Sequence, residues 1–347
     1  MDSPAAQGST KLVDRARLKW LLDREQKKFV DEHPKSRALF ERASRCLLGG
    51  VPMNWMSKWA GAFPPFVREA QGAHLYDVDG HRYVDFCLGD TGAMTGHSPA
   101  AMVSAVGQQL GRGIALMLPS EDGISVADEL GKRFGLPFWQ FALSATDANR
   151  FSIRLARAIT NRPKILIFNW CYHGTVDETF ITLQQGRGGP RKGNLGPPVD
   201  PSLTTKVVEF NDVDALEKAL QPGDVACVLA EPALTNVGIV HPAPGFHTAL
   251  RALTRKYGTL LIIDETHTIC AGPGGFTGAE NLAPDLLVFG KRSAEAFPAR
   301  LTDSPNRLLK TSLSALRLRI AIRVESAARS PATLSRLPPC APRYRRC

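Results

Sequence analysis

The stretch TLLIIDETHTICAGPGGFTGAENLAPDLLVFGK, residues 259–291, decides the fold of this chain. Its apolar run 260–263 ends on Asp264-Glu265, and a second apolar run, 286–289, ends on Gly290-Lys291. Short apolar runs of this kind predict buried parallel strands. Because ligands of open α/β sheets bind outside the carboxyl ends of the strands, we expect the acid and the lysine to face one ligand.

A lysine and an aspartate at such an edge suggest a particular chemistry. A lysine amine can form a Schiff base with an aldehyde, and a carboxylate can keep a pyridine nitrogen protonated. These are the two protein groups that pyridoxal phosphate needs most. The alternative, that Asp264 and Lys291 are ordinary solvated groups at strand ends, stays open on this stretch alone.

The chain before this stretch alternates between strand and helix patterns. That alternation predicts a largely parallel α/β sheet. The expected strands are 141–143, 164–168, 206–210 and 225–230, and the expected helices are 147–160, 213–220 and 245–257. Farther upstream we expect an amphipathic arm helix at 11–30, a helix at 39–50, a hairpin at 74–86 around Asp79-Gly80, and helices at 99–111 and 124–134.

Ser144-Ala145-Thr146 lies between an expected strand and an expected helix. The first N–H groups of a helix are unpaired and carry the positive end of its dipole, so this turn is a candidate phosphate site. The alternative is that Ser144 only caps the helix, with Asp147 completing a capping box.

Two more strand exits carry candidate site residues. The first is followed by Cys171-Tyr172-His173-Gly174, where an aromatic ring could stack on a planar cofactor and an imidazole could lie near the chemistry. The second ends on Glu231-Pro232. Residues 184–201, rich in Gly, Pro and basic residues, are expected to form a long surface loop of the kind that often borders a site.

Composition narrows the class of protein. Of the 347 residues, 44% are hydrophobic and 22% are charged, as in globular proteins. The sequence contains no run of 18 apolar residues, so we expect no membrane span. No signal peptide is recognisable, and seven scattered cysteines form no metal spacing, so we expect a cytoplasmic protein with reduced thiols and no metal site. The net charge of +10 is concentrated in residues 292–347, which contain 12 basic and 3 acidic residues. Residues 1–291 contain 31 basic and 30 acidic residues and are therefore almost neutral.

Taken together, these motifs resemble the class III (subgroup II) aminotransferases of the pyridoxal phosphate fold-type I superfamily. The similarity is greatest to the branch containing glutamate-1-semialdehyde 2,1-aminomutase. It runs in the family's order from about residue 39 to 291, through the motifs LFERASRCLLGGV, YDVDGHRYVDF, SATDANRFSIRLARAITNRPKI, CYHG, AEPALTNVGIVHPAPGFHTALRALTRKYGTLLIIDE and PDLLVFGK.

The resemblance implies a role for each matching residue. Lys291 would bind the cofactor aldehyde and shuttle a proton, and Asp264 would pair with the pyridinium nitrogen. Ser144, Ala145 and Thr146 would hold the phosphate, and Tyr172 would stack on the ring. The remaining cofactor-binding candidates are His173, as a neighbour, and Glu231 and Asn236, near the ring edge and its hydroxyl.

The chain departs from the family at several positions. Ala145 stands where the family has glycine, Thr266-His267 where it has Val or Gln, and CAGPGG where the aminomutase branch has an arginine-containing turn. Residues 292–347 contain none of the 30 glycines. From this break in composition we infer a reading-frame shift at or just after the Lys291 codon, which removed the family's small C-terminal domain.

We therefore predict three parts: an arm helix and hairpin segment at 1–95, an incomplete cofactor-binding large domain at 96–291, and a basic, disordered tail at 292–347. The expected function is amino transfer between an amino acid or amine and a carbonyl acceptor, in a homodimer without membrane or nucleic-acid partners. The alternatives are glutamate-1-semialdehyde aminomutase activity and a non-catalytic truncated remnant. The tail could also be a basic arm for nucleic acid.

Overall fold

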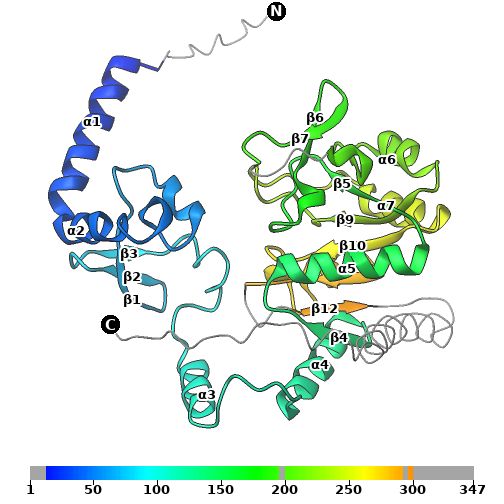
Figure 1. Ribbon diagram of the computed structural model, residues 1–347, viewed down its shortest axis with the longest axis horizontal. Helices are drawn as coiled ribbons and strands as arrows, with labels where there is room; N and C mark the ends of the chain where they lie inside the picture. Colours follow the sequence, from blue (N-terminus) through cyan, green and yellow to red (C-terminus); the bar gives the residue numbers. More distant parts are fainter. Residues whose placement is uncertain (1–12, 195–199, 292–295, 300–347) are drawn as a thin grey trace, which may run out of the picture. The chain divides into compact units, whose positions relative to one another are not determined.

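The computed structural model describes residues 13–194, 200–291 and 296–299 (Figure 1). The chain divides into two compact units between Leu116 and Met117, whereas the sequence suggested a boundary at residue 95. All candidate site residues lie in the second unit.

The first unit contains helices and a small antiparallel sheet. Helix α1 (Arg15–Glu32) begins at Asp14, whose carboxylate accepts a hydrogen bond from the Arg17 amide and so caps the helix. The expected hairpin forms β2 (His74–Asp77) and β3 (Arg82–Val84), to which β1 (Val67–Gln71) adds a strand that the sequence did not predict. The remaining elements are α2 (Pro34–Ala43), η1 (Leu48–Gly50), η2 (Asn54–Lys58) and α3 (Ala100–Leu110).

The second unit is built on a seven-stranded sheet of order β4-β12-β11-β10-β9-β5-β8. Its strands are β4 (Phe138–Phe141), β5 (Lys164–Phe168), β8 (Thr205–Val208), β9 (Val225–Ala230), β10 (Leu260–Asp264), β11 (Leu286–Val288) and β12 (Ala296–Ala299). Only β12 runs antiparallel to its neighbours, which confirms the expected mainly parallel sheet.

Apolar side chains fill both faces of this sheet. The β5 residues 165–168 and every residue of β9 are buried, and a fully buried large apolar side chain contributes about 1.5–3 kcal/mol. Helix α5 (Ala145–Thr160) packs on β9, β10, β11 and β12 (Figure 1). The other helices of the unit are α4 (Glu121–Phe134), α6 (Val213–Leu220), α7 (Phe246–Lys256) and the short α8 (Gly275–Ala279), with 3-10 turns η3 (Asp177–Thr179), η4 (Pro201–Leu203) and η5 (Ile269–Ala271).

Several segments differ from the sequence prediction. The helix expected at 39–50 is observed earlier, as α2 (Pro34–Ala43). The expected loop at 184–201 includes a hairpin, β6 (Ile181–Gln184) and β7 (Arg187–Pro190). Its turn residues Gln185 and Gly186 both have positive φ, 53° and 78°, as a tight hairpin turn requires. Composition alone did not distinguish this turn from an irregular loop.

Part of the expected tail also has regular structure. The four residues of β12 fall within 292–347, and their backbone pairs with β11 and β4. A short strand can form there because two neighbouring strands offer backbone donors and acceptors, whatever the side chains. The rest of the predicted tail lies outside the described residues. Among the described helices, none combines the length and apolar character that crossing a bilayer requires.

Candidate active site

Four parallel strands deliver the candidate residues to one edge of the sheet. Strand β10 pairs with β11 so that Asp264 lies opposite Val288, and Lys291 follows three residues later. On its other side β10 pairs with β9, which leads into Glu231, and β9 pairs with β5, which leads into Tyr172 and His173. The expected meeting of these residues at the carboxyl ends therefore follows from the register.

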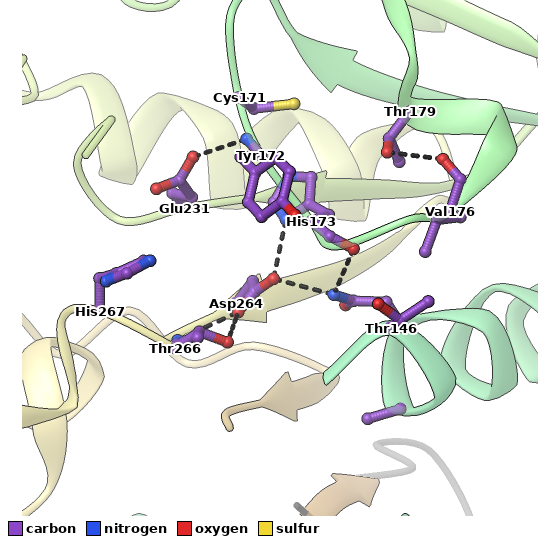
Figure 2. Close-up of polar contacts among 12 residues, drawn as sticks. Thr146, Cys171, Tyr172, His173, Val176, Thr179, Glu231, Asp264, Thr266 and His267 are labelled. Atoms are coloured by element: carbon purple, nitrogen blue, oxygen red, sulfur yellow. Dashed lines mark hydrogen bonds and ion pairs between the residues drawn. The ribbon is translucent and has the colours of Figure 1, made fainter. Parts of the chain in front are cut away.

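The Asp264 carboxylate is the most densely bonded group at this edge. Its Oδ2 accepts hydrogen bonds from Asn149 Nδ2 at 2.9 Å and His173 Nδ1 at 2.8 Å. Its Oδ1 accepts from the Thr266 amide at 3.0 Å and from Thr266 Oγ1 at 2.6 Å. Figure 2 shows His173 and Thr266 directed at Asp264, which is only 3% exposed. The site therefore holds a fixed, buried carboxylate.

Asp264 and His173 form a buried ion pair. Burial works against ionisation of Asp264, but hydrogen bonds and charge from His173, with further bonds from Thr266 and Asn149, lower the pKa of Asp264 below its usual value. Burial likewise lowers the pKa of His173, but the Cys171 sulfur and the Asp264 carboxylate outweigh it and raise the pKa of His173 well above its usual value. The directions of both pKa shifts favour an anionic Asp264 beside a protonated His173.

This pair predicts a pH-dependent stability. Because the pKa of His173 is raised in the folded protein, its contribution is complete below the unfolded-state pKa of about 6.5. It is lost as the pH rises through the higher folded-state pKa. We expect the excess free energy of unfolding of the wild type over His173→Gln to shrink as the pH rises above about 6.5 in urea titrations.

His247 provides the control for this prediction. Burial lowers the pKa of His247, so the sign is opposite and its contribution is lost as the pH falls below about 6.5. The excess stability of the wild type over His247→Gln should therefore grow with pH. Parallel slopes for the two variants would contradict the assigned charge of His173.

Tyr172 and Glu231 are linked next to this pair. The Tyr172 amide donates to Glu231 Oε1 at 3.0 Å, and Thr235 Oγ1 donates to Glu231 Oε2 at 2.6 Å. Glu231 is buried, whereas the Tyr172 side chain is 39% exposed and has an accessible ring. Glu231 thus fixes the backbone of the turn that carries Tyr172. Asn236 is exposed, five residues beyond Glu231.

The first turn of α5 supports both interpretations of Ser144. Ser144 is the N-cap: its Oγ accepts from the Asp147 amide and donates to the Asp147 carboxylate, each at 3.0 Å. Ala145 and Thr146 are the first helical residues, whose amides have no intrahelical acceptor. Ala145 is absent from the positive-φ residues, so the helix start itself does not require the family's glycine.

Gly174 lets the turn after Tyr172 pack against Thr146. Its φ is 74°, and a Cβ there would overlap Thr146 Oγ1. Next to it, the Thr175 amide donates to Thr146 Oγ1 at 3.0 Å, so the Thr146 hydroxyl keeps its hydrogen for another acceptor. The turn that follows β5 and the first turn of α5 are thereby in direct contact.

We expect Gly174→Ala to destabilise the protein by about 2–4 kcal/mol, from left-handed backbone strain of about 1–2 kcal/mol plus overpacking against Thr146. Gly186→Ala is a matched control, because Gly186 has φ 78° and nothing within 4 Å of its Cβ position. It should cost only the backbone term of about 1–2 kcal/mol. Urea unfolding measures both, and equal losses would show that the contact with Thr146 is unimportant.

Lys291 lies at the exit of β11 with φ 65° and an exposed side chain. Its Nζ is 3.2 Å from His267 Nε2, at one of the positions where the chain departs from the family. An imidazole nitrogen that carries no hydrogen can accept a hydrogen bond from a lysine ammonium. His267 is therefore placed to orient the lysine.

Sequence reasoning missed Asn149. This buried side chain donates hydrogen bonds to the Asp264 carboxylate and, at 3.3 Å, to the His173 carbonyl oxygen. It therefore connects α5 to the carboxyl ends of β10 and β5. Its signal was a polar residue on the apolar face of a helix, in register with Ser152 and Ile153. Arg191, from the predicted loop, also reaches the site, since its Nη2 donates to the Cys171 carbonyl oxygen at 2.7 Å.

These residues fit pyridoxal phosphate. The fixed anionic carboxylate suits a pyridinium nitrogen, the half-exposed ring suits stacking, and the helix N-terminus suits a phosphate. One adjustment is needed, because four donors already occupy the roughly four lone-pair positions of the Asp264 carboxylate. The Thr266 hydroxyl can free one position by rotating about a single bond, without moving the backbone.

Comparisons with known proteins agree with this site. The Aminotransferase class-III family model matches residues 55–313, and the chain therefore belongs to the class-III aminotransferase family. The match ends 22 residues after Lys291. The recognition of the family and of its pyridoxal phosphate fold type from sequence motifs is thus confirmed.

The similar proteins include aminomutases. Glutamate-1-semialdehyde 2,1-aminomutase of Methanosphaera stadtmanae is 38% identical over 270 residues, covering 76% of this chain and 63% of that protein. The crystal structure of a glutamate-1-semialdehyde aminomutase from Pseudomonas aeruginosa is 47% identical with a TM-score of 0.83, covering 87% of this chain and 67% of that one. A variant of the latter, solved in complex with PMP, gives the same values. The chain spans about 63% of the length of the curated relatives it matches.

Proposed function

We propose that this chain binds pyridoxal phosphate and transfers an amino group between an amino donor and a carbonyl acceptor. The single observation that carries the proposal is the buried Asp264 carboxylate, held ionised by His173 at 2.8 Å on the sheet edge that Lys291 also reaches. Family membership supports it. If the Asp264–His173 ion pair only stabilised the fold, there would be no reason for an exposed lysine, Lys291, at the end of the neighbouring strand β11.

When bound, pyridoxal phosphate supplies an electron sink for negative charge on the substrate carbon. Asp264 would hold the ring nitrogen protonated, and His173 would keep Asp264 ionised. Lys291 Nζ would hold the cofactor aldehyde and would move a proton at the substrate carbon, with His267 orienting the amine. Ser144, Ala145 and Thr146 would hold the phosphate at the start of α5, and Tyr172 would stack on the ring.

Glutamate-1-semialdehyde 2,1-aminomutase activity is a second candidate. The names of the relatives at 36–38% identity favour it. The departures at Thr266-His267 favour the broader aminotransferase assignment, because Thr266 contacts Asp264 and His267 contacts Lys291. Glu231 and Asn236 remain our candidates for contacts at the ring edge.

We also propose a homodimer and a cytoplasmic location. Exposed apolar side chains on α3 and the following loop, among them Met102, Val106, Leu110 and Leu116, support a partner surface. The described cysteines, at 46, 87, 171, 227 and 270, are free thiols, which supports a reducing compartment.

The test is a single half-reaction with the purified, cofactor-loaded chain. We expect a panel of amino acids and amines to convert the bound aldehyde to the amine form, as followed by absorbance, and a carbonyl compound to restore it. If glutamate-1-semialdehyde is supplied alone and is converted to an isomer without any second substrate, the result would instead establish aminomutase activity. Cofactor binding without either reaction would establish a non-catalytic remnant and overturn the proposed activity.

A further inference from the structure

A cluster of side chains of metal-binding types lies in the first unit, which contributes no residue to the candidate active site. It consists of His33, between α1 and α2, Asp77 at the end of β2, and His81 in the turn before β3. One ligand atom from each lies within 4.8 Å of the others. His33 and Asp77 are buried, and the His81 side chain is 37% exposed.

The hydrogen bonds of His33 fix which nitrogen faces the cluster. Its Nδ1 is 2.7 Å from the Phe29 carbonyl oxygen, and a carbonyl can only accept, so Nδ1 carries the hydrogen. Nε2 is therefore directed at Asp77 Oδ2, 3.4 Å away. A histidine whose other nitrogen donates to a backbone carbonyl has the arrangement usual for metal ligands.

The cluster lacks one hydrogen if its histidines are neutral. Tyr83 Oη is 2.7 Å from His33 Nε2 and 2.9 Å from Asp77 Oδ2. A phenol has one hydrogen, so with His33 neutral one of these two short contacts joins two lone pairs. The same carboxylate oxygen is 3.0 Å from His81 Nδ1. One additional positive charge among these atoms, either a proton or a metal cation, resolves the conflict.

We propose that His33 Nε2, His81 Nδ1 and an Asp77 carboxylate oxygen bind one divalent transition-metal ion, with Zn²⁺ as the reference ion. Two imidazoles and a carboxylate suit Zn²⁺, and water completes a tetrahedral set. Tetrahedral bonds of about 2.0–2.2 Å set ligand atoms about 3.3–3.6 Å apart, so the 3.0 Å between His81 Nδ1 and Asp77 Oδ2 must widen. The Tyr83 hydroxyl, 2.7 Å from His33 Nε2, must also turn aside to admit the ion. The half-exposed His81 gives access, and the ion links the α1–α2 junction to the β2–β3 hairpin.

The test uses the full chain without a histidine tag, freed of metal by dialysis against EDTA. We expect calorimetry with ZnCl₂ to give one ion per chain and the melting temperature of the first unfolding transition to rise on binding. Co²⁺ should give a tetrahedral visible spectrum without a thiolate charge-transfer band, which excludes the free cysteines as ligands.

The decisive variant is His81→Ala, since His81 is the least buried ligand. We expect a loss of Zn²⁺ affinity of at least tenfold, with the metal-free variant folding like the wild type. His74→Ala, in the same hairpin, is the matched control and should bind as the wild type does. No stoichiometric Zn²⁺ binding would overturn the proposal, as would equal Zn²⁺ affinity in His81→Ala and the wild type.

Discussion

Asp264→Asn is expected to slow the half-reaction of the cofactor-loaded chain by about 10²–10⁴-fold. The change removes the negative charge at the ring nitrogen and leaves His173 as a buried cation without its partner. A slowing of this size corresponds to about 2.7–5.4 kcal/mol in the activation barrier, at about 1.36 kcal/mol for each tenfold change in rate. Loss of one member of the buried ion pair separately lowers the stability of the fold, by about 3–5 kcal/mol. Stopped-flow absorbance with an amino donor measures the rate.

The control for this variant is Asp200→Asn, at the exposed cap of η4, where Asp200 accepts from the Ser202 amide. It should react at the wild-type rate. Cofactor affinity and urea stability of Asp264→Asn must be measured alongside, so that a loss of folding is not counted as a loss of chemistry. A folded, cofactor-bound Asp264→Asn that reacts at the wild-type rate would contradict the role given to this carboxylate.

Asp285→Ala is expected to lower the free energy of unfolding by about 3–5 kcal/mol. Asp285 binds Arg251 through two hydrogen bonds, of 2.7 and 2.9 Å, and also accepts from the Leu261 amide at 2.8 Å. The two charged side chains are only 7% and 12% exposed, so removal of the acid leaves a guanidinium unpaired in the interior. Urea unfolding measures the loss.

Two further variants make this prediction specific. Glu129→Ala breaks an ion pair with Arg133 on α4 whose side chains are each 50% exposed, and it should cost about 0.2–1 kcal/mol. The double variant Arg251→Met with Asp285→Leu replaces the buried pair by apolar groups and should recover most of the stability. If Asp285→Ala costs no more than Glu129→Ala, burial does not govern this pair.

The buried strands of the second unit could be predicted closely from the sequence. The bounds expected for β5, β9 and α6 are those observed, because uninterrupted apolar runs and clear caps mark them. Strand β4 forms at 138–141 instead of at the expected 141–143, since one apolar run, FWQFAL, continues through both registers. Strands β1 and β12 were missed because their formation depends on neighbouring strands rather than on their own pattern.

The position of the candidate residues at one edge of the sheet could be predicted from the sequence, but their hydrogen bonds could not. Asp264 and Lys291 were found because each ends an apolar run, and parallel register brings them to one edge. The partners of Asp264 could not be read in the same way. The His173 contact joins residues 91 positions apart and the Asn149 contact joins residues 115 apart, so only the folded sheet shows them.

The measurement that tests the central claim most directly is chemical trapping of the cofactor. The purified chain is incubated with pyridoxal phosphate, reduced with borohydride, digested and analysed by mass spectrometry beside Lys291→Ala. Our account predicts a phosphopyridoxyl group on the peptide containing Lys291, and no specific adduct in the variant. Labelling spread over exposed lysines, or equal labelling of the variant, would contradict the assignment of this sheet edge as a pyridoxal phosphate site.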